Sequence, residues 1–154
     1  NALSRLAEDL DAPVRWLAFH RHQDGELLDW LTDQGVVPPG LRSRSTTVIP
    51  SSLDTVFASV RKARLVIPMR LHALILARLA HCPMAALSYD PKVEAAAAMA
   101  GIPCSSLDAL PDEPTLLKQW RESMDSPADS DQIERIRAAA AHHGSHLRRY
   151  LPQR

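Results

Sequence analysis

Short apolar segments alternate with helical patterns along the first two thirds of this chain, and this alternation restricts the fold more than any other feature. The segments at 14–19, 45–49, 65–68 and 84–87 are rich in apolar or β-branched residues. Helical apolar spacing follows each of them. Nearly continuous apolar strands are typical of parallel sheets that are covered on both faces. We therefore predict an α/β fold, a Rossmann-like parallel sheet with helices on both faces.

Cap and turn residues set the expected boundaries of the helices. Asp24 stands where the N-cap of a helix over 26–34 belongs, and Gly35 suits its end. Ser51 and Ser52 can cap the helix that follows them. Loops are expected at 20–25 and from residue 38, a region that includes Arg42 and Arg44. The other predicted elements are helices at 2–10, 93–100, 114–123 and 130–151, a strand, loop and helix over 64–82, and a last strand at 102–104.

The chain divides into two expected parts. Residues 1–110 form the Rossmann-like α/β domain, and residues 111–154 form C-terminal helices that pack on it. A βαβ unit begins with a strand, whereas residues 2–10 have a helical pattern. We therefore expect the first strand of the domain to lie upstream of residue 1.

Composition excludes several classes of protein. Of the 154 residues 45% are apolar and 23% are charged, with a formal net charge of zero, which is typical of a globular domain. Balanced charge gives no general attraction to nucleic acid, and no stretch approaches the roughly 18 apolar residues of a membrane span. Cys82 and Cys104 lack a zinc-binding spacing. Free thiols in a reducing compartment are favoured over a disulfide, so we expect a cytoplasmic location.

Arg70 and His72 are the first candidate site residues. They follow the apolar run at 65–68, where a strand is expected to pass into a helix at the ligand-binding edge of an α/β sheet. A guanidinium matches carboxylate or phosphate oxygens bidentately, and a histidine can transfer a proton near neutral pH. The structural alternative is that Arg70 pairs with a protein carboxylate and that His72 caps or packs locally.

Polar residues also follow the neighbouring strands. Tyr89, Asp90 and Lys92 come after 84–87, and Lys92 at a helix start can hold a phosphate, whereas Asp90 is more simply an N-cap. His20, His22 and Asp24 follow 14–19 and form a weak metal pattern, for which a solvated loop is the favoured interpretation. His142, His143 and His146 are expected on an exposed helical face. The chain has no Gly-x-Ser-x-Gly elbow, dinucleotide-binding glycine motif or P-loop.

The segment Met69–Ala77, with Arg70-Leu71-His72, and the segment Ser88–Val93, with Tyr89-Asp90-Pro91-Lys92, resemble the polysaccharide pyruvyl transferase family. The resemblance is strongest to its bacterial CsaB-like branch, which pyruvylates cell-wall-linked polysaccharide. Phe19-His20 and Gln23-Asp24 are similar to a strand end and a following aspartate in that family. The resemblance covers about residues 1–105 and is weaker beyond them.

The resemblance implies the C-terminal domain of a GT-B-type enzyme that faces an N-terminal domain across a cleft. Family members transfer the pyruvyl group of phosphoenolpyruvate to a sugar, which forms a ketal and releases phosphate. Arg70 and His72 match family residues implicated in catalysis, and Arg70, Leu71, His72 and Lys92 are the expected phosphoenolpyruvate contacts. His20, Asp24, Tyr89 and Asp90 complete the expected cleft.

The expected partners follow from this chemistry. They are phosphoenolpyruvate as donor substrate, a saccharide acceptor and the N-terminal domain. We expect no cofactor, metal or nucleic acid. The sequence is compatible with a homo-oligomer. We expect activity in the full-length transferase and none in this chain alone. His72 is either the acid that protonates the donor or a phosphate ligand. Two other functions stay open: a GT-B glycosyltransferase or nucleotide-sugar epimerase, and a non-catalytic module that binds an anion or a partner.

Overall fold

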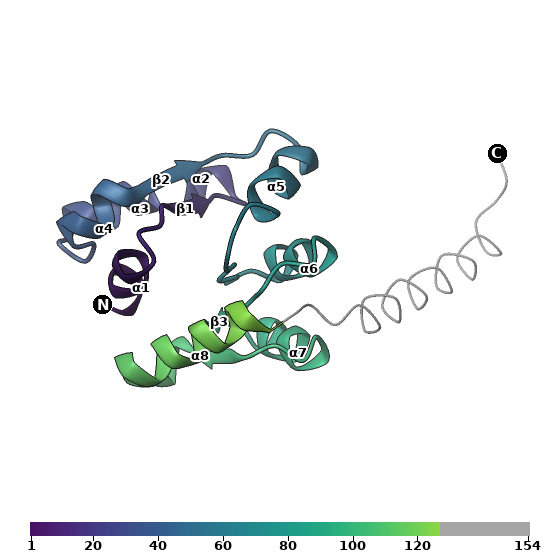
Figure 1. Cartoon of the computed structure of the whole chain (residues 1–154). Coiled ribbons are helices and arrows are strands. Elements are labelled where there is room, and N and C mark those ends of the chain that lie inside the picture. Colours follow the sequence, from purple (N-terminus) through teal and green to yellow (C-terminus); the bar gives the residue numbers. More distant parts are fainter. Residues whose placement is uncertain (127–154) are drawn as a thin grey trace, which may run out of the picture.

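A computed structural model describes residues 1–126 as a mixed α/β fold (Figure 1). The elements up to residue 60 are α1 (Ala2–Asp9), β1 (Val14–Leu17), α2 (Arg21–Asp24), α3 (Leu27–Asp33), α4 (Pro39–Arg44), β2 (Ser45–Val48) and α5 (Leu53–Val60). After them come α6 (Leu71–Leu79), β3 (Ala86–Ser88), α7 (Pro91–Met99), β4 (Cys104–Ser106), the 3-10 turn η1 (Leu107–Ala109) and α8 (Glu113–Asp125). The helix predicted at 130–151 and its three histidines lie outside the described residues.

The strands form two small parallel sheets instead of the single sheet that the sequence suggested. β1 pairs with β2, from Val14 opposite Ser45 to Leu17 opposite Val48. β3 pairs with β4, and residues 65–68 add one bridge, between Val66 and Met84. Within residues 1–126 no backbone hydrogen bond joins β1 to 65–68. The described residues are thus α/β, but they do not form the continuous sheet expected of a GT-B-type domain.

We call residues 1–48, with α1 to α4, the β1–β2 region, and residues 65–126 the β3–β4 region. Figure 1 shows α2–α5 around the β1–β2 pair in the upper part of the view, and α6–α8 around β3 in the lower part. One cluster lies wholly in the β1–β2 region and packs α1, α3 and α4 together through Ala7, Leu28, Val37 and Leu41. Another packs α6 and α7 on β3 through Leu74, Ala86, Val93 and Ala97.

Side-chain packing joins the two regions where strand pairing does not. On one side, α1 contacts both α4 and α8, and Leu6 packs with Ala85 and Trp120. On the other side lies a cluster that we call the joint cluster. It consists of Val56, Val60, Ala77, Cys82 and Met84, with Leu17, Phe19 and Val66 packed against it. The two regions therefore share a hydrophobic core without sharing a sheet.

Several local predictions are confirmed. Ser52 caps α5, because its hydroxyl accepts a hydrogen bond from the Thr55 N–H at 3.2 Å. Asp90 caps α7 in the same way, at 2.9 Å from the Lys92 N–H. Gly35 follows α3 with φ +68°, a left-handed conformation that glycine adopts without strain.

Other local predictions are wrong. Residues 20–25 and 38–44 are not loops, because α2 and α4 occupy them, and α4 begins on Pro39, whose fixed φ suits a first helical residue. Asp24 is not the N-cap of α3; Glu26 is, and Asp24 ends α2. The last strand begins at Cys104 instead of residue 102.

The structure also bears on the state of the cysteines and on membrane-spanning helices. Cys82 and Cys104 are both free thiols. Among the described residues, no helix is both long enough and apolar enough to cross a membrane.

Candidate functional site

The segments after three strands meet at one edge of the molecule. The Leu87 N–H donates to the Pro68 carbonyl at 3.1 Å, so the chain leaves 65–68 and β3 side by side. The β1–β2 pair ends nearby, where the Ala18 N–H donates to the Val48 carbonyl at 2.9 Å. A contact between Arg70 and Asp24 connects the two groups of strand ends. This is the edge at which ligands bind in α/β folds.

Arg70 lies at the start of α6 and has two side-chain partners. Its extended backbone makes it the N-cap residue, and its guanidinium turns back to the segment after β1. Nη2 donates to Asp24 Oδ1 at 2.6 Å and to Gln23 Oε1 at 3.1 Å. The side chain keeps 35% of its exposure, so an anion from solvent can still reach the guanidinium.

Asp24 is held from two sides. One turn of helix places it four residues after His20, whose backbone N–H donates to Asp24 Oδ2 at 2.8 Å. Its other carboxylate oxygen takes the bond from Arg70, and its side chain keeps 16% of its exposure. Gly25 permits this tight turn, because a Cβ there would lie 2.5 Å from the Arg21 carbonyl oxygen.

The pKa values of the pair shift as an ion pair requires. Burial alone would raise the pKa of Asp24, but the hydrogen bonds from Arg70 and from the His20 backbone, with the nearby positive charge, bring it below its usual value. The bond to Asp24 raises the pKa of Arg70, and Tyr89 lies near enough to add to this effect. Both groups are therefore charged at neutral pH.

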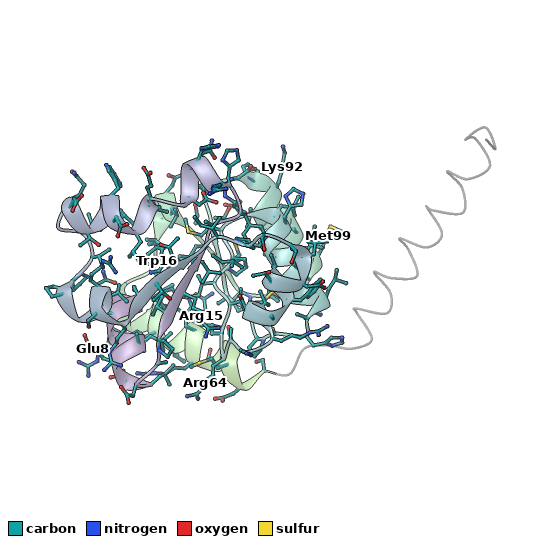
Figure 2. All side chains as sticks on the ribbon, turned by 90° about the horizontal axis from the view of Figure 1, so that it is seen from above. Glu8, Arg15, Trp16, Arg64, Lys92 and Met99 are labelled. Carbon is teal, nitrogen blue, oxygen red and sulfur yellow. The ribbon has the colours of Figure 1, made fainter. Side chains whose placement is uncertain are left out.

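The residues after β3 are only partly brought to this edge. Tyr89 is 55% exposed and close enough to Arg70 to interact electrostatically. Asp90 has the structural role that the sequence favoured, as the cap of α7. Lys92 is exposed at the rim of the molecule (Figure 2), and its backbone N–H binds Asp90. The predicted approach of Lys92 to Arg70 stays a prediction.

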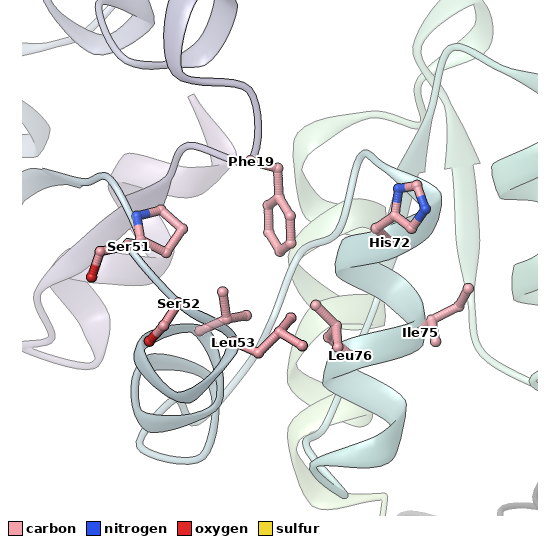
Figure 3. A pocket seen from close by; sticks show the side chains of 9 residues that line it. Phe19, Ser51, Ser52, Leu53, His72, Ile75 and Leu76 are labelled. Atoms are coloured by element: carbon pink, nitrogen blue, oxygen red, sulfur yellow. The ribbon is translucent and has the colours of Figure 1, made fainter.

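His72 lines a pocket to which neither Arg70 nor Asp24 contributes. A pocket of about 440 Å³ lies between α5 and α6 (Figure 3). Phe19 and Leu53 line one side, and His72, Ile75 and Leu76 line the other. The remaining lining residues are Pro50, Ser51, Ser52 and Val56. His72 is exposed, and its place in the first turn of α6 keeps it two residues from Arg70.

The histidines after β1 do not build a metal centre with Asp24. His20 and His22 are exposed, and their rings meet edge to face with centroids 6.5 Å apart. Both Asp24 oxygens are occupied by Arg70 and by the His20 backbone. No group of three metal-ligating side chains occurs within residues 1–126.

The structure thus brings together Arg70, Asp24, the backbone of His20 and Tyr89, and places His72, two residues after Arg70, on the pocket. Sequence reasoning missed two contributors. Gln23 binds Arg70, and its position directly before Asp24 was the available signal. Phe19 lines the pocket because it ends the apolar run of β1.

Comparisons of the chain with models of protein families, with curated protein sequences and with solved structures found no match. The resemblance of the Arg70-Leu71-His72 and Tyr89–Lys92 segments to the pyruvyl transferases therefore stays a prediction.

Proposed function

We propose that this chain is the C-terminal part of a polysaccharide pyruvyl transferase. The full-length enzyme transfers the pyruvyl group of phosphoenolpyruvate to a saccharide of a cell-wall or exopolysaccharide. The observation that carries the proposal is the position of Arg70: a guanidinium fixed at the start of α6, still reachable from solvent, with His72 two residues away. The backbone N–H groups of the first turn of α6 add to the attraction for an anion at this point.

The donor has two anionic groups that suit such an edge. A planar guanidinium can bind the carboxylate or phosphate of phosphoenolpyruvate through two parallel hydrogen bonds. Lys92, at the start of α7, supplies a second positive charge for the phosphate. Asp24 keeps Arg70 in place and does not itself contact phosphoenolpyruvate.

The reaction needs a proton donor beside the donor carbons. One sugar hydroxyl adds to C2 of phosphoenolpyruvate as C3 takes a proton, which turns the methylene into a methyl group. A second sugar hydroxyl then replaces the phosphate at C2, so the products are a cyclic ketal and inorganic phosphate. His72 is the proposed acid for C3, a role that typically contributes about 10²–10⁴-fold to the rate. Binding the phosphate is its alternative role.

Titration of the chain with phosphoenolpyruvate in a calorimeter tests the donor site. We expect Arg70→Lys to weaken binding about tenfold or more, because a point charge replaces a fork. Arg44→Lys is the matched control, since Arg44 pairs with Asp11 in the β1–β2 region. Failure of the unchanged chain to bind phosphoenolpyruvate, or equal binding by Arg70→Lys, would contradict the proposal.

Turnover in the full-length protein tests His72. We expect His72→Ala and His72→Gln to lower kcat about 10²-fold or more if the imidazole is the acid. His81→Asn is the control, because His81 is exposed with φ +58°, a conformation that asparagine tolerates. Unchanged turnover in both His72 variants would remove His72 from the mechanism.

The pocket between α5 and α6 favours a second candidate, an enzyme that acts on nucleotide sugars. Phe19 and Pro50 give this pocket ring surfaces against which a nucleobase can stack, while Arg70 could bind the diphosphate. Thermal-shift titrations with phosphoenolpyruvate and with nucleotide sugars separate the two candidates. Stabilisation by nucleotide sugars alone would favour the second candidate. If the protein binds an anion, but the full-length form releases no phosphate when a saccharide acceptor is added, a non-catalytic module is favoured.

A further inference from the structure

Both side-chain hydrogen bonds of Arg70 use the nitrogen that a bidentate anion also needs. A guanidinium offers two such edges, Nε with Nη2 and Nη1 with Nη2, and both include Nη2. Nη2 also donates to both partners of Arg70, Asp24 Oδ1 at 2.6 Å and Gln23 Oε1 at 3.1 Å. A ligand that binds Arg70 bidentately therefore competes with these two partners for Nη2.

The two partners differ in how firmly they are held. Asp24 is charged, accepts the shorter bond and is fixed by the His20 backbone N–H through its other oxygen. Gln23 is neutral and exposed, and its bond to Arg70 is longer. Both bonds have the charged guanidinium as donor, but only the bond to Asp24 also has a charged acceptor, so Coulomb attraction makes it the stronger of the two. An incoming carboxylate or phosphate therefore replaces Gln23 at a lower cost in free energy than it replaces Asp24.

We propose that Asp24 is a positioning residue that holds Arg70 for anion binding, and that Gln23 is the partner which the anion displaces. Asp24 keeps the guanidinium turned to the edge where β1 and 65–68 end. In the free protein Gln23 Oε1 accepts a hydrogen bond from Nη2, and the anion takes its place on binding. This inference rests on the proposed donor site, because it assigns a role to the neighbours of its central residue.

Asp24 could instead oppose anion binding through its negative charge, and the test must distinguish this role from positioning. A carboxylate next to an anion site repels the anion, and if repulsion dominated, removing the charge would tighten binding. Positioning predicts the reverse sign. The direction in which affinity changes in Asp24→Asn therefore distinguishes the two roles.

The experiment is calorimetric titration with phosphoenolpyruvate, and with inorganic phosphate as a second probe, at low ionic strength. We expect Asp24→Asn to weaken phosphoenolpyruvate binding about tenfold, and Asp24→Glu, which keeps a carboxylate, to restore most of it. We expect Gln23→Ala to bind up to about threefold tighter, since the anion no longer competes with an amide. A merely structural role of α2 would not produce that rise in affinity.

Asp29→Asn is the matched control, because it removes an equal charge from an exposed ion pair with Arg42, outside the proposed site. It should leave the affinity within about twofold. Tighter or unchanged binding by Asp24→Asn, or unchanged or weaker binding by Gln23→Ala, would overturn the proposal.

A second measurement does not depend on phosphoenolpyruvate. In urea unfolding of the free chain, Asp24→Asn and Arg70→Lys should not be additive, so the double variant changes the unfolding equilibrium constant hardly more than the more severe single variant. The pair Gln23→Ala and Arg70→Lys should deviate less from additivity, because the acceptor of that bond is neutral. If the first pair is additive, Asp24 does not hold Arg70 and the inference fails. If the coupling is present but neither anion binds the unchanged chain, the proposed donor site fails, and the anion-displacement part of the inference fails with it, leaving only the contact.

Discussion

The β1–β2 region and the β3–β4 region are both built on a pair of parallel strands, but they bury those strands to different extents. In β3, Ala86 is 1% exposed and Ser88 is fully buried, and helices cover both faces. In β1 every residue retains partial exposure or more. The candidate site therefore spans both: Arg70 belongs to the well-buried region, while its partner Asp24 belongs to α2 of the less buried one. The geometry of the site depends on how well the two regions are joined.

The largest expected effect comes from Trp120, which is 3% exposed and packs α8 against Leu6 and Ala85. We expect Trp120→Ala to lower the free energy of unfolding by about 3–5 kcal/mol, because it removes a large side chain from the packing between the regions. Urea denaturation followed by circular dichroism measures this change. Trp30→Ala is the control, since Trp30 is 57% exposed on α3 and should change stability by about 0.5 kcal/mol or less.

Leu28 tests whether the β1–β2 region unfolds on its own. It is 2% exposed within the cluster that is internal to that region. We expect Leu28→Ala to cost about 2–5 kcal/mol, and unfolding to stay a single transition because α1 and the joint cluster connect the regions. Leu27→Ala, at a 37% exposed neighbour, is the control. Two separate transitions in Leu28→Ala would show that the regions are independent domains.

The N-cap residues of α5 and α7 allow the two regions to be compared through smaller and similar expected losses of stability. Ser52 caps α5 beside the β1–β2 region, and Asp90 caps α7 in the β3–β4 region. We expect Ser52→Ala and Asp90→Ala to cost about 1 kcal/mol each, because each leaves a backbone N–H without its side-chain acceptor. Chemical denaturation of both variants is the measurement. A loss in only one of them would mean that only its region contributes to the cooperative unit.

The smallest expected effect is the pH dependence of Asp24. Its pKa in the folded chain is below its usual value, for the reasons given above, and the unfolded value is about 3.9. Stabilisation by this carboxylate is therefore fully present above about pH 3.9 and is lost as pH falls through the lower folded pKa.

Urea denaturation between about pH 5 and pH 2.5 checks this, and we expect Asp24→Asn to lose less stability over that range than the unchanged chain. Asp112→Asn gives the comparison from the other region. Hydrogen bonds from the side chain and backbone of Thr115 lower the pKa of Asp112, which caps α8 without an ion pair. Added salt should weaken the effect of Asp24 more than that of Asp112, since only Asp24 depends on an opposite charge.

Local signals predicted much of the fold, and non-local ones did not. Ser52, Asp90 and Gly35 act within a few residues of themselves, so their roles could be read directly from the sequence. The pairing of strands depends on residues far apart along the chain. The sequence pattern of 14–19 and 65–68 is compatible with one sheet, and it does not show that the two segments form no hydrogen bonds with each other.

The candidate site followed the same rule. Parallel strands bring their ends to one edge, so Arg70, Asp24 and Tyr89 were correctly expected in one neighbourhood. The pairing of Arg70 with a protein carboxylate was one of the two interpretations of the sequence, but Asp24 was not foreseen as that carboxylate, because it was assigned to the start of α3. A helix of one turn, α2, has too few residues to show a periodic apolar pattern. The place of His72 on the pocket depends on the packing of α5 against α6, which spacing along the chain does not specify.

The thiol of Cys82 lies inside the joint cluster, 5% exposed, where its S–H donates to the Val60 carbonyl at 3.0 Å. Burial raises its pKa, and a protonated, enclosed thiol reacts slowly with disulfide reagents. Leu17 and Phe19 pack against this cluster from one region and Met84 from the other, so the thiol becomes reachable when the regions separate. The rate at which a disulfide reagent labels Cys82 therefore reports how often the two regions separate at the joint cluster.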